Sequence, residues 1–212
     1  MPEGSPDADL VRLPAFQAGM RIGILGGSFD PPHRGHLAVS LVGLKALALD
    51  QIWWLVSPQN PLKPNAPSKD LARRIEAART LVRHPRIHVT GIEAALGTTY
   101  TADTFRKLLP RLPGLDLVWM MGADSLAGFH RWRDWQTIAA SMPIAVFNRP
   151  GSALRALSSP AARSLSAYRI PETAAAALAQ TQAPAWIFLS KPHVPLSSTA
   201  LRAAASKTKS AS

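Results

Sequence analysis

The chain has 212 residues, enough for one sizeable domain, and its 47% hydrophobic and 17% charged residues are typical of a globular protein. It contains no cysteine, which excludes disulfides, thiolate metal sites and a cysteine nucleophile. The formal net charge of +11, from 24 Lys and Arg against 13 Asp and Glu, is compatible with nucleic acid, an anionic surface or small phosphorylated ligands as partners.

The distribution of charged and apolar residues narrows these possibilities. The basic residues are scattered, and neither zinc-finger spacing nor an RNA-binding aromatic signature occurs, so we expect no nucleic-acid partner. The chain begins with acidic residues, unlike a signal peptide, and its most apolar stretch, 38–49, is interrupted by Lys45 and too short to span a bilayer. We therefore expect a cytoplasmic protein with no membrane partner. The oligomeric state has no signature in the sequence.

The chain divides into a folded domain and two tails. Residues 1–19 contain three prolines and no clear periodicity, which predicts a poorly ordered extension. A single domain is expected over 20–205, followed by a flexible tail over 206–212.

Apolar runs and helix-forming segments alternate within this domain. The runs predict buried strands over 21–25, 51–57, 86–90, 115–121, 143–148 and 185–190. Helices are predicted over 37–49, 68–83, 101–109, 134–141, 153–168 and 199–205. This order predicts an α/β fold: a single Rossmann-like, doubly wound, mostly parallel sheet with helices on both faces. Ligands of such sheets bind beyond the carboxyl ends of the strands.

The most informative segment, Gly26-Gly-Ser-Phe-Asp-Pro-Pro-His-Arg-Gly-His36, follows the first predicted strand. Gly26 and Gly27 allow a tight turn and a close approach of the backbone to a ligand. The next helix is expected to start near Gly35, so its free N–H groups and positive dipole end face the same loop. His33 and His36 lie three residues apart, on one face of its first turn. Together these features predict an anion site with two imidazoles, suited to a polyphosphate.

Each feature has a simpler explanation when taken alone. The two histidines could hold a metal ion, but neither an HExxH motif nor a third ligand accompanies them. Ser197-Ser-Thr199 before a helix, taken alone, is better explained by N-capping, and Asp124 could simply cap a turn. Trp53 and Trp54 lie in a predicted strand and are expected in the core.

Three segments, in order, resemble one protein family. His33-Arg-Gly-His36 resembles the HxGH signature of the nucleotidyltransferase superfamily, and the fuller GGSFDPPHRGH resembles its nicotinate-nucleotide adenylyltransferase branch. Residues 117–125 (LVWMMGADS) are similar to the fourth strand and GADS turn of that family. Residues 196–202 (LSSTALR) are similar to its ISSTxxR motif, with Leu196 in place of the usual Ile. The resemblance extends from about Met20 to Arg202.

The resemblance implies a site for ATP formed by the first and third segments. The residues expected to bind ATP are Gly26, Gly27, Ser28, Phe29, His33, His36, Ser197, Ser198, Thr199 and Arg202. Of these, His33, His36 and Arg202 are expected to be catalytic. We expect Mg²⁺ to enter bound to ATP, because no cluster of carboxylates is present to hold a resident metal. Lys63 could be a further phosphate contact or simply a solvated lysine.

The resemblance also implies a site for nicotinate mononucleotide. Trp132, eight positions after Asp124, is the candidate to stack on the pyridine ring; Trp135 is the next choice, and a core role for Trp132 stays open. The segment from Thr99 to Thr104 resembles the family's YTxDT segment, whose hydroxyl and N–H groups suit a carboxylate, which favours nicotinate over nicotinamide. The residues expected to bind this acceptor are Thr99, Tyr100, Thr101, Gly122, Asp124 and Trp132.

The resemblance implies the reaction of ATP with nicotinate mononucleotide to give deamido-NAD and pyrophosphate, a step in NAD biosynthesis. Transfer to another phosphorylated acceptor, such as nicotinamide mononucleotide or phosphopantetheine, or use of CTP, remains an alternative within the superfamily. Outside it, a non-catalytic nucleotide-binding or nucleic-acid-binding protein remains possible. Both histidines and Arg202 favour catalysis.

Overall fold

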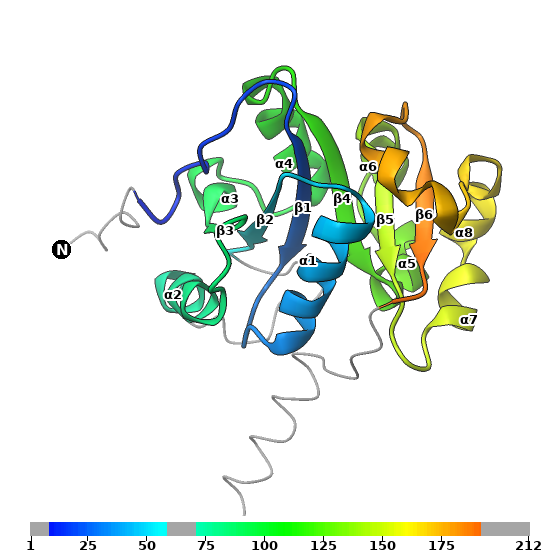
Figure 1. The fold of residues 1–212 in the computed structure, drawn as a ribbon, viewed down its shortest axis with the longest axis horizontal. Helices are drawn as coiled ribbons and strands as arrows, with labels where there is room; N and C mark the ends of the chain where they lie inside the picture. Colours follow the sequence, from blue (N-terminus) through cyan, green and yellow to red (C-terminus); the bar gives the residue numbers. More distant parts are fainter. Residues whose placement is uncertain (1–8, 59–70, 192–212) are drawn as a thin grey trace, which may run out of the picture.

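In the computed structural model the described residues, 9–58 and 71–191, form a layered α/β domain around one parallel sheet (Figure 1). The six strands run in the order β3-β2-β1-β4-β5-β6, and every ladder between neighbours is parallel. The strands are β1 (Arg21–Gly27), β2 (Gln51–Val56), β3 (Ile87–Thr90), β4 (Asp116–Gly122), β5 (Ile144–Phe147) and β6 (Trp186–Leu189). The predicted strands and the parallel sheet are confirmed.

Helices cover both faces of the sheet, as the sequence predicts. One face packs against α1 (Arg34–Ala46), α2 (Leu71–Leu81) and the 3₁₀ helix η4 (Glu172–Gln180). The other packs against α3 (Ile92–Ala95), α4 (Thr101–Leu108), α5 (Ala123–Gly128), α6 (Trp135–Ser141), α7 (Ala153–Leu157) and α8 (Pro160–Ser164). The described residues also form three shorter 3₁₀ helices: η1 (Leu109–Arg111), η2 (Phe129–Arg131) and η3 (Ser166–Tyr168).

The strand residues are apolar on both sides because each face of the sheet is buried. In β1, Ile22 and Ile24 belong to one core, whereas Leu25 belongs to the other. Trp53 and Trp54 of β2 point to opposite faces in the same way, and both side chains are fully buried. Their predicted core role is confirmed.

Several helical segments differ from the sequence-based prediction. The helix expected over 153–168 is divided into α7, α8 and η3, because Ser159 caps a new helix that begins at Pro160. The short helices α3 and α5 and the 3₁₀ helix η4 were not predicted. The predicted helix over 199–205, the tail over 206–212 and the beginning of the helix predicted from Ser68 lie outside the described residues.

Residues 9–19 pack against the domain, in contrast to the poorly ordered extension predicted over 1–19. Leu10 is buried, and its carbonyl accepts a 2.8 Å hydrogen bond from the Gly91 N–H. The Thr90 hydroxyl donates to the Arg12 carbonyl at 2.7 Å. The apolar side chains of this segment therefore contribute to the core; residues 1–8 lie outside the described residues.

The strand order reverses between β1 and β4, and this reversal defines where a ligand can bind. After β1 the chain enters α1 on one face of the sheet, and after β4 it enters α5 on the other. The two connections diverge and open a crevice at the carboxyl ends of these strands. Within the described residues, no helix is long and apolar enough to cross a membrane.

Candidate active site

The loop after β1 is shaped by close packing around its glycines. A Cβ at Gly26 would collide with the ring of Trp119 on the neighbouring strand, so glycine is needed there. Phe29 adopts a left-handed backbone conformation (φ 45°), and its buried ring stacks on Trp54 with centroids 4.8 Å apart. The Phe29 side chain is therefore part of the core, which leaves only its backbone for the predicted ATP contact.

His33 and His36 form the N-terminal cap of α1, in a reciprocal arrangement. The His33 Nδ1 accepts a hydrogen bond from the Gly35 N–H at 3.1 Å, and the His36 Nδ1 accepts from the His33 N–H at 3.2 Å. The two ring centroids are 3.8 Å apart. The capping geometry thus holds both imidazoles side by side at the positive end of the helix dipole.

This arrangement determines the protonation of the two rings. Burial, with a smaller contribution from Arg149, lowers the pKa of His33 to about 4. Burial, followed by the charges of His33 and Arg149, lowers the pKa of His36 to about 3. Both rings are therefore neutral at pH 7, and because each Nδ1 accepts a hydrogen bond, each proton is on Nε2. The His33 Nε2 is buried and has no hydrogen-bond partner among the described residues, so its N–H is available to donate to an anionic oxygen of a ligand.

A buried hydrogen-bond chain connects the backbone of His36 to the core. The Ser40 hydroxyl donates to the His36 carbonyl at 2.9 Å, and the Trp54 indole N–H donates to the Ser40 Oγ at 2.8 Å. Phe29 packs against both the His36 and Trp54 rings. The position of His36 is therefore tied to the core of the sheet.

Arg149, which follows β5, interacts with the GADS turn after β4 and acts electrostatically on both histidines. Its guanidinium forms an ion pair with the predicted acceptor residue Asp124 at 3.3 Å, and it lies close enough to His33 and His36 to lower the pKa of both. The predicted residue Gly122 packs against the Asp124 carboxylate, where a Cβ would be 2.5 Å from Oδ1. The sequence analysis did not identify Arg149.

Arg74 of α2 forms hydrogen bonds with the backbone of the glycine-rich loop. Its side chain is buried, and Nη1 donates to the carbonyls of Ser28 at 2.6 Å and Ser57 at 2.7 Å. Nη2 donates to the Pro58 carbonyl at 3.0 Å. One guanidinium therefore joins the ends of β1 and β2, a role that no sequence motif indicated.

A cavity of about 330 Å³ opens beside the glycine-rich loop. It is lined by the predicted ATP-site residues Gly26, Gly27 and Ser28 and by the predicted acceptor residues Thr99, Tyr100, Thr101 and Trp132. Trp132 packs edge-to-face on Phe129 at 5.4 Å and reaches the cavity, whereas the second choice, Trp135, packs on Phe129 without lining it. The fold thus brings residues 26–28, 99–101 and 132 together around one volume.

Seven further residues line the cavity and were not predicted as site residues. They are Ser57, Glu93, Trp119, Ser125, Arg131, Arg133 and Ile138. Arg133 lies 5.0 Å from the Tyr100 ring centroid and pairs with Asp103 at 3.5 Å. Arg131 is exposed and forms no ion pair with the described residues. The Trp119 indole N–H is buried without a hydrogen-bond partner among them.

The third predicted segment lies outside the described residues: it contains Ser197, Ser198, Thr199 and Arg202, and the same holds for Lys63. Within those that the structure describes, no three His, Cys, Asp or Glu side chains gather as a potential metal site.

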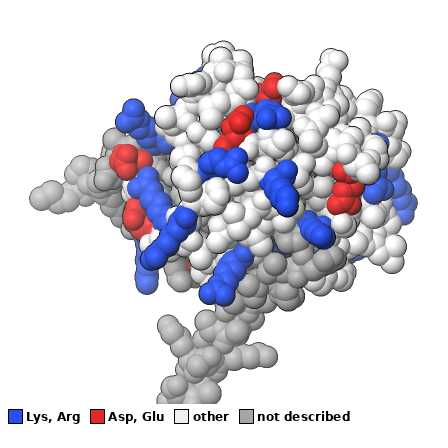
Figure 2. Space-filling model, viewed as in Figure 1, with Lys and Arg blue, Asp and Glu red and all other residues white. Residues whose placement is uncertain are grey.

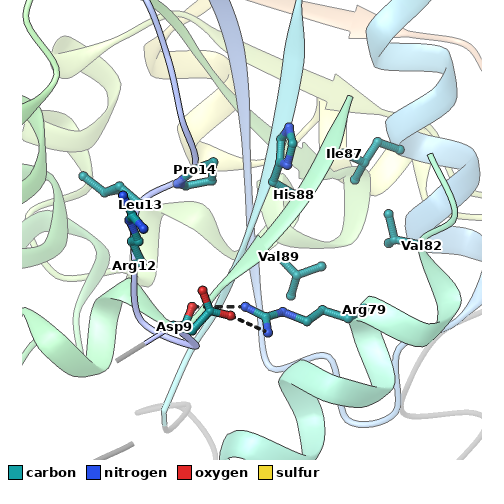
Figure 3. Close-up of a pocket in the computed structure, with 9 residues that line it drawn as sticks. All are labelled: Asp9, Arg12, Leu13, Pro14, Arg79, Val82, Ile87, His88 and Val89. Carbon is teal, nitrogen blue, oxygen red and sulfur yellow. Dashed lines mark hydrogen bonds and ion pairs between the residues drawn. The ribbon is translucent and has the colours of Figure 1, made fainter. Parts of the chain in front are cut away.

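A second cavity, of about 300 Å³, lies between the N-terminal segment and the β3 edge of the sheet (Figure 3). Arg12 and His88 border it, and Arg79 is paired there with Asp9 at 3.4 Å. None of the predicted site residues lines this cavity. On the face seen in Figure 2, Lys and Arg side chains are spread over the surface with acidic residues among them, without one dominant basic patch.

Comparison with known proteins places the chain in a family. Residues 24–204 match the model of the cytidylyltransferase-like family. The chain is 54% identical over 184 residues to a protein of Cereibacter sphaeroides described as a probable nicotinate-nucleotide adenylyltransferase, covering 87% of this chain and 97% of the relative. It is 51% identical over 192 residues to a protein of Ruegeria pomeroyi with the same description, covering 91% and 90%.

Solved structures agree at the level of the fold. The structure of Plasmodium falciparum nicotinic acid mononucleotide adenylyltransferase complexed with APC superimposes with a TM-score of 0.62 at 15% identity, over 87% of this chain and 83% of that one. The same enzyme complexed with NaAD gives a TM-score of 0.61 at 16% identity, with equal coverage. The matched sequences and the observed sheet together establish that the chain belongs to the nicotinate-nucleotide adenylyltransferase family.

Proposed function

We propose that this protein transfers the adenylyl group of ATP to nicotinate mononucleotide, giving deamido-NAD and pyrophosphate in NAD biosynthesis. The observation that carries the proposal is the pair of neutral imidazoles at the start of α1, together with the preceding glycine-rich loop, whose residues 26–28 line a cavity that reaches Trp132. The relatives' descriptions support the same reaction.

The chemistry requires alignment more than proton transfer. An oxygen of the acceptor's 5′-phosphate forms a bond to the α-phosphorus of ATP while the bond to the β-phosphate oxygen breaks. Pyrophosphate leaves with the bonding electron pair. The attacking phosphate is already an anion at neutral pH, so no general base is needed, and the protein has to position both substrates and stabilise the phosphoryl oxygens.

The first segment is assigned to the phosphates of ATP. His33 and His36 would donate Nε2–H hydrogen bonds to phosphate oxygens, and the backbone N–H groups of residues 26–29 would lie beside them. Neutral donors need no proton uptake before ATP binds. Arg149 adds a positive charge next to both rings and is assigned to the same anion. Ser197, Ser198, Thr199 and Arg202 are proposed for the β and γ phosphates.

The second side of the site is assigned to the acceptor. Trp132 would stack on the pyridine ring, and residues 99–101 would face its carboxylate with hydroxyl and N–H groups. Asp124 would accept hydrogen bonds from the ribose hydroxyls, in exchange for part of its pairing with Arg149. The divalent ion that nucleotidyltransferases use with ATP is proposed to be Mg²⁺, which would enter with the substrate and would supply positive charge to the leaving pyrophosphate.

The test is release of pyrophosphate from ATP with different acceptors, measured side by side. Nicotinate mononucleotide should be the best acceptor, ahead of nicotinamide mononucleotide and phosphopantetheine, and CTP should not replace ATP. His36→Ala should lower kcat by on the order of 10²-fold, the loss expected for one donor to a charged transition state. His84→Ala, at a histidine outside the site, is the matched control and should leave kcat unchanged.

Two results would overturn the proposal. One is the absence of turnover with nicotinate mononucleotide while another acceptor reacts. The other is a salt-dependent affinity for nucleic acid without any turnover of ATP, which would indicate a binding protein.

A further inference from the structure

Glu93 is a buried acid in the wall of the cavity that the proposed mechanism does not use. It lies on α3, immediately after β3, and its side chain is only 5% exposed. It lines the same cavity as Thr99, Tyr100 and Trp132. An acidic side chain is unexpected in a cavity assigned to an acceptor that carries a carboxylate and a phosphate, because like charges repel more strongly away from water.

The hydrogen bonds around Glu93 form a chain of hydroxyl groups. The Thr104 Oγ1 lies 3.4 Å from the Glu93 Oε1 and 2.8 Å from the Thr98 Oγ1. The same Thr104 hydroxyl lies 3.2 Å from the Tyr100 carbonyl, and the Thr98 hydroxyl lies 3.4 Å from the Glu93 carbonyl. The Ser57 hydroxyl is a further partner of the carboxyl group.

This chain can be satisfied in both protonation states of Glu93. With a carboxylate, Thr98 donates to Thr104, and Thr104 donates to Glu93. With a neutral acid, Glu93 donates to Thr104, Thr104 donates to Thr98, and Thr98 donates to the Glu93 carbonyl. Each hydroxyl reverses its direction without movement of heavy atoms, so neither state leaves a buried donor unpaired.

The burial of Glu93 sets the pH at which this reversal occurs. Burial raises the pKa of the Glu93 carboxyl to about 7, and the hydrogen bonds from Ser57 and Thr104 oppose the rise only partly. The neutral acid is therefore well populated in the physiological range, where an exposed glutamate would be fully ionised.

The charged groups around Glu93 are few and mostly engaged. On α4, Asp103 pairs with Arg133, while Lys107 donates to the Leu96 carbonyl at 2.7 Å. At the end of β2, the Arg74 guanidinium is directed to backbone carbonyls, including that of Ser57. The remaining titratable or charged groups in the cavity wall are Tyr100, Arg131 and Arg133. None of them forms an ion pair with Glu93 among the described residues.

We propose that Glu93 determines acceptor affinity: as a neutral acid it admits the carboxylate of nicotinate mononucleotide to the cavity, and as a carboxylate it opposes that group. The proposal rests on the proposed function of the same site. Glu93 acts on binding, through charge and through the Thr98–Thr104 chain that supports residues 99–101, and it does not contact the reacting phosphorus.

Linkage gives the expected direction of the pH effect. If the acceptor binds better to the neutral acid, its binding raises the pKa of Glu93 further and takes up a proton. The KM for nicotinate mononucleotide should therefore be constant below pH 7 and rise above it, by at most about tenfold per pH unit for one proton. Nicotinamide mononucleotide has the cationic ring but lacks the carboxylate, so its KM should not rise over the same range.

The experiment compares the wild type with Glu93→Gln between pH 6 and 8.5, using kcat and KM for both acceptors. Glutamine has the shape and hydrogen-bonding capacity of the neutral acid, so the variant should keep a low KM for nicotinate mononucleotide at pH 8 and lose the added pH dependence. The value of kcat should change little. Titration of ATP, Mg²⁺ and the acceptor phosphate is common to both proteins and cancels in the comparison. Glu76→Gln, the same change at an exposed position on α2, should behave as the wild type.

A second measurement covers the case in which Glu93→Gln does not fold. Calorimetry of the wild type in buffers of different ionisation enthalpy should show proton uptake when nicotinate mononucleotide binds at pH 8. Parallel KM profiles for the wild type and a folded Glu93→Gln would overturn the proposal, as would binding without proton uptake. Both results require measurable reaction with or binding of this acceptor, so they are distinct from failure of the proposed function, in which it does not react at all.

Discussion

Replacement of His33 by asparagine should alter the pH dependence of stability by a predictable amount. Asparagine is a good N-cap, so its Oδ1 can accept the Gly35 N–H as the His33 Nδ1 does, while the titrating ring is removed. The His33 pKa of about 4 lies below the value of about 6.5 expected for the unfolded chain. The unfolded state therefore binds the proton first, and stability is complete above pH 6.5 and is lost as the pH falls through this window.

The magnitude follows from these two pKa values. Between pH 7 and pH 5 the wild type should lose about 2 kcal/mol of unfolding free energy through His33, which is buried enough for the shift to apply. The variant should not lose this amount. Contributions from His36 and Glu93 are present in both proteins and cancel in the difference.

Urea unfolding at pH 7, 6 and 5 measures this difference directly, provided both proteins unfold in one cooperative step. The stability of the variant relative to the wild type should increase by about 2 kcal/mol as the pH falls from 7 to 5. Parallel curves would show that the folded state does not hold His33 in the neutral form, and would refute the protonation state on which its assignment as an Nε2–H donor depends.

Three further predictions concern the substrates. Trp132→Ala should weaken the binding of nicotinate mononucleotide by about 1–3 kcal/mol, the range for base–aromatic stacking, and should leave ATP binding unchanged. If calorimetry shows equal losses of affinity for both substrates, Trp132 is a core residue. Arg149→Ala should raise the pKa of His33 and His36 in an NMR titration and should lower kcat/KM for ATP by on the order of tenfold. Unchanged histidine pKa values would show that Arg149 does not act on the two imidazoles. Arg202→Lys should lower kcat/KM for ATP by on the order of tenfold at fixed ionic strength, because an ammonium group cannot replace a bidentate phosphate contact. If the Arg202→Ala variant has the kinetics of the wild type, Arg202 makes no such contact.

Periodicity and composition were sufficient to predict the sheet. Each strand of a doubly wound sheet is buried on both faces, so it appears in the sequence as a short continuous apolar run such as QIWWLV, over 51–56. The short helices α3 and α5 lack such a signal, since four to six residues do not complete an apolar period. Residues 9–19 have no period at all, and their order comes from tertiary contacts such as that between Leu10 and Gly91.

The candidate site could be predicted where a motif marks it and not elsewhere. His33 and His36 occur in a recognisable local pattern, and the Gly-rich loop precedes them in the chain. Arg149 and Glu93 reach the site through pairing of distant strands, and nothing in their neighbouring residues distinguishes them from other arginines and glutamates. Only burial and proximity, which depend on the whole fold, identify them.

Because the strand order reverses between β1 and β4, the candidate active site is built from two parts that lie on opposite faces of the sheet. The residues assigned to the triphosphate and those assigned to the acceptor come from different stretches of chain. The former come from the loop after β1, from Arg149 and from 197–202, and the latter mainly from 91–133. The acceptor wall includes short helices and turns on one face of the sheet, whereas the histidines are anchored in the packing of the other face through Ser40 and Trp54. Substitutions in the acceptor wall can therefore change which acceptor binds without moving the two imidazoles. The acceptor site and the histidine pair can thus change independently in evolution.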